Sequence, residues 1–185
     1  MTAGRFTIMS TPDVIPTPPV KDKIVIYFLA SSNKQDMDAC DTVQKHLAQF
    51  IRNAKPAIEI YSDSMIEGGE DRDKYQEVLY TADLVIIFGS SDFIADDSNF
   101  NRVKKVIIRY NNRETRLMAI IVRNFLWKEP FFGKLPVILP SAQRPLYDQK
   151  TWSIDDAFST VAQEMIDVIT KHYKIEQSTI EINPW

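Results

Sequence analysis

Short apolar segments alternate with amphipathic helical patterns along most of this chain, and that alternation limits the folds open to it. Residues 24–29, 84–88 and 117–122 are continuously apolar, as strands buried on both faces of a sheet are. A further strand is expected at 57–61, where β-branched and aromatic residues gather. Because single helices separate these strands, the pattern predicts an α/β fold with a parallel sheet.

The helices are predicted from apolar residues that recur every three or four positions. The first follows Asp36, which is expected to cap it, and the second covers 70–81. A third has its apolar face within 100–110, and the last begins at Ser153, which with Asp156 resembles a capping box. A proline-containing connection before the last helix leaves room for one more short strand. Right-handed crossovers then place helices on both sides of the sheet, in three layers.

The length and the proline distribution suit one domain with short tails. A chain of 185 residues, 44% of them hydrophobic, is long enough for one folded domain and too short for two. Four prolines cluster before residue 20 and predict an extended tail over 1–20. The domain is expected over 21–175, with a C-terminal tail over 176–185.

Composition argues against several partners. No apolar run approaches the roughly 20 residues that span a membrane, so no membrane partner is expected. The single cysteine, Cys40, cannot form an internal disulfide, which favours a reducing, cytoplasmic compartment. A net charge of -3 and a pI near 5.4 argue against nucleic-acid binding.

The motifs of several common enzyme classes are missing. With only five glycines, the chain has neither the Gly-rich loop of dinucleotide-binding folds nor the P-loop of NTPases. Both histidines lie in helical patterns, away from the strand ends where a Ser-His-Asp hydrolase needs one, and no cluster has the spacing of a metal site. Function is therefore expected in the loops that follow the first three strands, at 31–36, 62–70 and 90–99, because such loops meet at one edge of a parallel sheet.

Several short motifs follow one another in an order that is more specific than any one of them. They are Ser62 to Asp71 before a helix, Ala82 to Ile87, Ser90-Ser91-Asp92-Phe93-Ile94-Ala95, Trp127, Phe132-Gly133-Lys134-Leu135, and Trp152-Ser153. Over about residues 23–169 this set resembles a bacterial Toll/interleukin-1 receptor (TIR) domain. The resemblance implies a flavodoxin-like three-layer sandwich with a five-stranded parallel sheet in the order 2-1-3-4-5, in which the loop after strand two is the BB loop.

The resemblance also implies two activities. Members of the family associate through the BB loop, and many bacterial members cleave NAD at the nicotinamide-ribose bond when assembled. A Glu on the third helix supplies the carboxylate that stabilises the oxocarbenium-like state of that reaction. Counting from Phe93 leads to Val103 at the position expected for this Glu, and its neighbours Arg102 and Lys104 are not acids either. The usual catalytic acid is therefore absent, and the candidates to replace it are Asp92, Asp96 and Asp97.

An NAD-like ligand, bound or cleaved, is expected in the cleft between the loop after strand one and the BB loop. The residues expected to contact it are Ala30, Ser31, Ser32, Asp63, Ile66 and Gly68. Charge placement predicts an assembly contact in which the acidic BB loop of one subunit meets the basic third helix of another. The residues expected there are Glu67, Glu70, Asp71, Arg102, Lys104, Lys105 and Arg109.

The sequence thus favours a TIR-domain protein that needs no cofactor and acts in signalling or bacterial defence by associating with other TIR domains, its own or a partner's. The alternative is an NAD glycohydrolase, releasing nicotinamide and ADP-ribose or cyclic ADP-ribose, that uses a non-standard acid. A third interpretation, a mimic that disrupts the TIR assemblies of another organism, would need delivery to that organism. Nicotinamide release, concentration-dependent scattering and co-purification with a partner distinguish the three.

Overall fold

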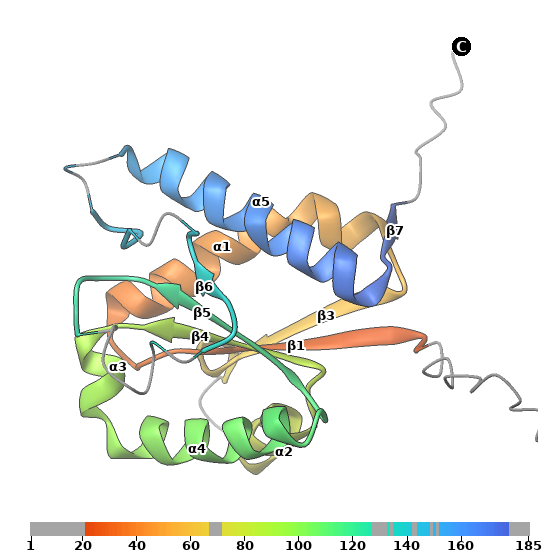
Figure 1. Ribbon diagram of the computed structural model, residues 1–185, viewed down its shortest axis with the longest axis horizontal. Coiled ribbons are helices and arrows are strands. Elements are labelled where there is room, and N and C mark those ends of the chain that lie inside the picture. Colours follow the sequence, from red (N-terminus) through yellow and green to blue (C-terminus); the bar gives the residue numbers. More distant parts are fainter. Residues whose placement is uncertain are drawn as a thin grey trace, which may run out of the picture.

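Five parallel strands form the central sheet, in the order β3-β1-β4-β5-β6 (Figure 1). Their bounds are Lys23–Leu29 for β1, Ala57–Ser62 for β3, Leu84–Gly89 for β4, Arg116–Ile121 for β5 and Ile138–Leu139 for β6. The computed structural model describes residues 21–66, 72–126, 133, 135–141, 144–148, 150 and 152–177. The short β2 (Ala54–Lys55) lies outside this sheet, so β3 is the second of the five sheet strands along the chain. Counted in this way, the observed order is the predicted 2-1-3-4-5. The predicted parallel α/β fold is confirmed.

Helices cover both faces of the sheet, and each layer has its own core. On one side lie α1 (Lys34–Asn53) and α5 (Ile154–Tyr173), and on the other α2 (Arg72–Thr81) and α4 (Asp97–Asn111), as Figure 1 shows. Alternate residues of β1 enter the two cores: Ile26 packs with the α1/α5 side, and Leu29 with the α2/α4 side. The near-continuous apolar character of these strands is explained by burial on both faces.

Two helix starts differ from the sequence prediction. The cap of α1 is Asn33, whose side chain accepts from the Gln35 backbone N–H at 2.9 Å, and Asp36 lies one turn further on, fully buried. The expected loop at 90–99 contains a short helix, α3 (Ser91–Ala95), which is too short to show a helical period in the sequence. By contrast, Ser153 caps α5 as predicted, accepting from the Asp156 N–H at 3.2 Å.

The last described strand lies just beyond the C-terminal boundary that the sequence predicted for the domain. Glu176–Gln177, which the sequence assigned to the tail, forms β7 and pairs antiparallel with β2. The rest of that tail and the whole N-terminal tail lie outside the described residues. Within the described helices, none carries an apolar stretch long enough to cross a membrane.

Candidate functional site

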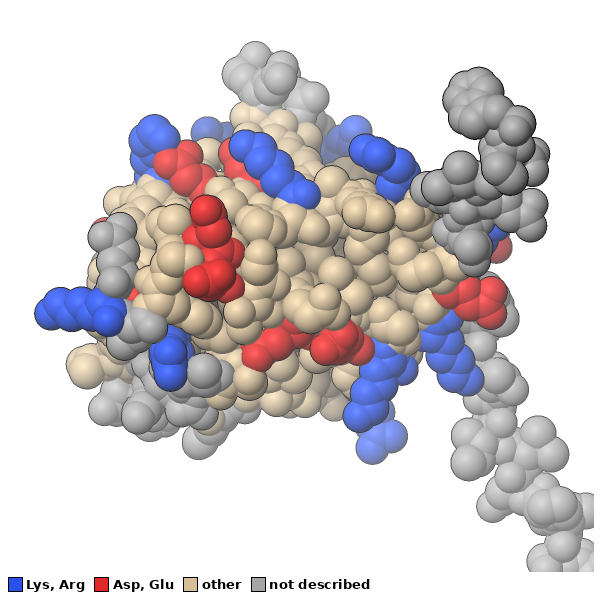
Figure 2. All heavy atoms as spheres, turned by 90° about the horizontal axis from the view of Figure 1, so that it is seen from above, with Lys and Arg blue, Asp and Glu red and all other residues tan. Residues whose placement is uncertain are grey.

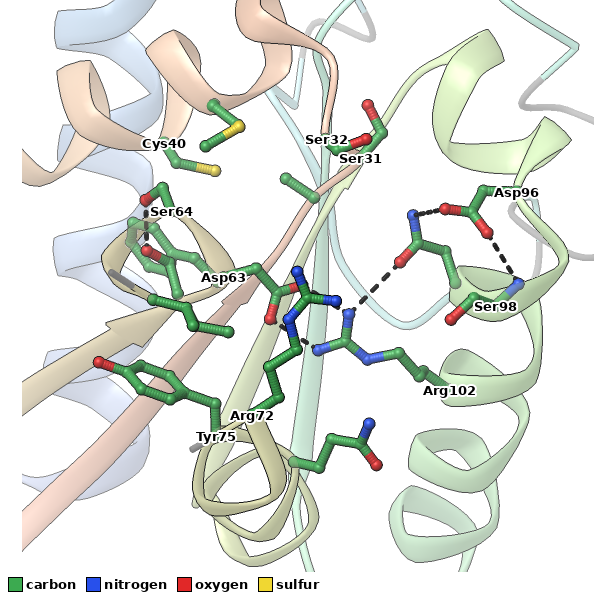
Figure 3. Close-up of a pocket in the computed structure, with 17 residues that line it drawn as sticks. Ser31, Ser32, Cys40, Asp63, Ser64, Arg72, Tyr75, Asp96, Ser98 and Arg102 are labelled. Carbon is green, nitrogen blue, oxygen red and sulfur yellow. Dashed lines mark hydrogen bonds and ion pairs between the residues drawn. The ribbon is translucent and has the colours of Figure 1, made fainter. Parts of the chain in front are cut away.

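A cleft of about 330 Å³ opens at the carboxyl ends of β1 and β3, where the sequence predicted a site (Figure 3). Its walls come from the first turns of α1 and α4, the start of α2, and the 3-10 turn η1 (Asp63–Met65) that follows β3. The lining side chains are Phe28, Ala30, Ser31, Ser32, Met37, Cys40, Ser62, Asp63, Ser64, Ile66, Arg72, Tyr75, Gln76, Asp96, Ser98, Asn99 and Arg102. The cleft is therefore polar, because four charged side chains and several serine and tyrosine hydroxyls line it.

An ion pair between Asp63 and Arg102 crosses this cleft. The two terminal nitrogens of Arg102 donate to the two carboxylate oxygens of Asp63, at 2.5 and 2.8 Å. Such two-pronged pairing fixes the guanidinium plane as well as its charge. The Tyr27 hydroxyl also donates to Asp63, from β1. The pair thus joins the end of β3 to the face of α4.

The protonation states of the three groups follow from this geometry. Burial lowers the pKa of Arg102, but the hydrogen bonds and charge of Asp63 outweigh that effect, so the pKa is raised overall. Burial and the neighbouring Asp63 charge raise the pKa of the Tyr27 hydroxyl far above its ordinary value. Arg102 therefore stays charged and Tyr27 stays neutral over the whole physiological range.

Arg102 is the charged α4 side chain that lines the cleft, whereas Val103 lies on the apolar face that the sequence predicted within 100–110. Val103 is fully buried and packs in the core of the α2/α4 side with Val106. Successive helical residues differ by about 100° in direction, so Arg102 can line the cleft while the next residue enters the core.

The three acids considered as substitutes have other partners or positions. Asp96 lines the cleft, but one of its oxygens caps α4 by accepting from the Ser98 N–H at 2.8 Å. Asp92 pairs with Arg123 at 2.5 Å, away from the cleft lining. Asp97 is exposed in the first turn of α4 and does not line the cleft. Of the three, only Asp96 could meet a ligand there.

The residues expected to contact a ligand gather at this cleft. Ala30, Ser31, Ser32, Asp63 and Ile66 all line it, and Gly68 lies outside the described residues. The sequence pointed to them because they follow β1 and β3, whose carboxyl ends share one edge of the sheet. Ligand binding by these residues stays a prediction.

The predicted assembly residues divide into three groups. Glu67, Glu70 and Asp71 lie outside the described residues. Two of the basic residues have largely buried side chains that make contacts within the chain: Arg102 with Asp63, and Arg109 with the carbonyls of Leu79 and Ala82 at 3.4 and 3.3 Å. A role for them in assembly stays a prediction. The remaining two, Lys104 and Lys105, are exposed on α4.

Sequence analysis missed a second cluster, centred on the buried Asp36. One of its oxygens accepts from the hydroxyls of Ser31, at 2.5 Å, and Ser90. The other accepts from Arg123 at 2.9 and 3.2 Å, and Arg123 also reaches Asp92. Asp36 therefore ties together the chain just beyond β1, β4 and β5.

Two further lining residues complete the chemistry of the cleft. Arg72, at the start of α2, is exposed and points toward Asp63 and Arg102 in Figure 3. Cys40 is buried, and that burial raises the pKa of its thiol, so it is not an activated nucleophile. The described part of the chain contains no group of acids, histidines and cysteines that could hold a metal ion.

The chain matches no protein-family model and no curated protein sequence. Among solved structures it is similar to the glutaminase domain of Trypanosoma brucei CTPS with bound acivicin, at 12% sequence identity and a TM-score of 0.35. The matched region covers 53% of this chain and 36% of that one, so the chain spans about a third of that structure. The strand order of the described sheet, rather than this likeness, defines the fold.

Proposed function

We propose that this chain is a flavodoxin-like TIR domain that acts by associating with other TIR domains, and that it does not hydrolyse NAD. The observation that carries the proposal is the Asp63–Arg102 ion pair across the cleft. It supports the proposal because the charged side chain that α4 contributes to the cleft is a guanidinium, and α4 contains no Glu. The cleft is then a site for a bound ligand rather than for turnover.

Cleavage of a nicotinamide-ribose bond needs negative charge beside the ribose. The oxocarbenium-like state carries positive charge, which a nearby carboxylate stabilises and a guanidinium repels. Asp63 already has both oxygens bonded, to Arg102 and Tyr27, and Asp96 serves as the cap of α4. Removing one preorganised electrostatic group commonly costs a factor of about 100 or more in rate, and here the sign of the charge is reversed.

The direct test is incubation of the purified chain with NAD at low and high protein concentration, with chromatography for nicotinamide and ADP-ribose. We expect no release at either concentration, together with a molecular mass by light scattering that rises with concentration. Release of nicotinamide by the native chain would overturn the non-enzymatic half of the proposal. A mass that stays monomeric at every concentration would overturn the association half.

The alternative, an NAD glycohydrolase with a non-standard acid, is favoured by one observation, namely that two carboxylates line the cleft. If nicotinamide is released, Asp63→Asn and Asp96→Asn distinguish the acid that acts. Asp97→Asn is the matched control, because Asp97 is a neighbouring acid outside the cleft lining.

A further inference from the structure

Opposite charge is concentrated on two helices that lie on opposite faces of the sheet. Helix α4 contains four basic side chains and one acidic one, and α5 contains four acidic side chains and one lysine. The other two long helices are balanced, since α1 has three acids against three bases and α2 has two against two. Two of the four basic side chains of α4, Arg102 and Arg109, are largely buried and bonded within the chain, so the exposed basic charge of this helix is that of Lys104 and Lys105.

The outward face of α4 presents one exposed aliphatic side chain, Ile108, beside two exposed lysines. Ile108 is 60% exposed, and it lies one helical turn from Lys104 and Lys105. The two ammonium groups lie over aromatic rings, Lys104 at 4.3 Å from the ring centre of Phe100 and Lys105 at 5.1 Å from that of Tyr80. These contacts hold both charges beside Ile108 on the surface.

The outward face of α5 has the complementary charge. Asp155, Asp156 and Asp167 are exposed along it, and Gln163 donates to Asp167 at 2.9 Å. Figure 2 looks onto this side of the molecule, where acidic side chains gather along the middle and basic ones lie toward the edges. No lysine or arginine is paired with these three acids among the contacts of the described residues.

We infer that the α4 face of one copy, formed by Lys104, Lys105 and Ile108, packs on the acidic α5 face of a second copy. The inference rests on the proposed function and names the surfaces of the association. Each copy offers both surfaces at once on opposite sides, so the contact is head-to-tail and repeats into a ring or a filament. Contacts between two α4 faces or between two α5 faces are disfavoured because like charges would meet.

Charge reversal on each surface tests the contact. We expect Lys104→Glu/Lys105→Glu and Asp155→Lys/Asp167→Lys each to weaken association about tenfold or more at low salt, because opposed charges become like charges. Lys55→Glu/Lys174→Glu is the matched control for the first variant. It makes the same change in net charge with two exposed lysines at the amino end of the sheet. Asp156 is left unchanged because it belongs to the cap of α5.

A mixing experiment then distinguishes head-to-tail packing from other arrangements. Lys104→Ser/Lys105→Ser keeps a native α5 face, and Asp155→Asn/Asp167→Asn keeps a native α4 face. Each protein alone is expected to stay monomeric by light scattering. Their mixture is expected to stop at a dimer of one copy of each, since only one native contact can form.

The outcomes separate the inference from the function on which it rests. If the native chain associates and none of the surface variants weakens it, this contact is wrong while association stands. If the asparagine variant forms dimers alone, the contact is symmetric and the head-to-tail inference is overturned. If the native chain never associates and a different acidic protein binds the α4 face, both the inference and self-association fail.

Discussion

Two carboxylates at the same edge of the sheet, Asp36 and Asp63, are each paired with an arginine but lie in very different surroundings. Asp36 has a fully buried side chain, whereas that of Asp63 is 32% exposed and lines the cleft. Asp36 is held by Ser31, Ser90 and Arg123, and Asp63 by Tyr27 and Arg102. The Asp36 contacts join the segments that follow β1, β4 and β5 to one another. The Asp63 contacts join the end of β3 to α4 across the cleft.

The difference indicates two roles for a similar chemical group. A buried carboxylate keeps its charge at low cost only when donors occupy its oxygens, so the Asp36 cluster acts as a fixed point for the loops that shape the site. The Asp63 pair is in contact with solvent, and it sets the charge of the cleft itself. Asp36 should therefore govern stability, and Asp63 the properties of the cleft.

Removal of the buried carboxylate should have the largest effect. We expect Asp36→Ala to lower the free energy of unfolding by about 3 kcal/mol, because two buried hydroxyls and Arg123 lose their acceptor. Chemical denaturation followed by fluorescence would measure it. The control is Asp38→Ala, an exposed acid two residues away on the same helix, with an expected change within about 0.5 kcal/mol. Equal losses in both variants would contradict a central role for Asp36.

The Asp63–Arg102 pair should show a smaller, strongly coupled effect. Arg102 is only 14% exposed and its Nε has no hydrogen-bond partner in the described structure, so loss of Asp63 leaves a poorly solvated charge. We expect Asp63→Asn to cost about 2 kcal/mol, and the further change Arg102→Met to recover part of that loss. A double-mutant cycle should give a coupling of about 1 to 2 kcal/mol. A coupling near zero would mean that the pair is not formed in solution.

The sequence predicted the elements of this fold better than it predicted these two clusters. Buried strands and amphipathic helices are visible locally, because apolar periodicity repeats within a few residues. Asp36 meets partners 54 and 87 residues away, and Asp63 meets Arg102 from 39 residues away. No short pattern records such distances. The apolar face of α4 that buries Val103 repeats locally and was predicted, whereas the contact of Arg102 with Asp63 depends on how α4 packs beside β3.

Alkaline pH should affect the Asp63 cluster through Tyr27, whose hydroxyl donates to Asp63. Burial and the negative charge of Asp63 raise the pKa of Tyr27. An unfolded tyrosine ionises near pH 10, whereas folded Tyr27 keeps its proton, so stability is complete below pH 10 and falls above it. The loss is at most about 1.4 kcal/mol per pH unit for each such tyrosine. Tyr27→Phe should reduce the slope between pH 10 and 11. Tyr173→Phe is the comparison, since Tyr173 is partly buried, also has a raised pKa, and donates to the Asp83 carbonyl instead of to Asp63.

Added salt should change the coupling energies least, but it should change those of the two ion pairs by different amounts. Raising ionic strength to 1 M shortens the screening length to about 3 Å, which weakens charge pairs that touch solvent and leaves enclosed pairs nearly unchanged. We expect the Asp63–Arg102 coupling to fall by a few tenths of a kcal/mol. The coupling of Asp36 with Arg123, from Asp36→Asn and Arg123→Met, should fall less, because the Asp36 carboxylate is fully buried although Arg123 is 24% exposed. Because a double-mutant cycle cancels general effects of salt on the fold, the two couplings can be compared directly. If both fall equally, Asp36 is reached by solvent and the proposed division between a framework carboxylate and a cleft carboxylate is wrong.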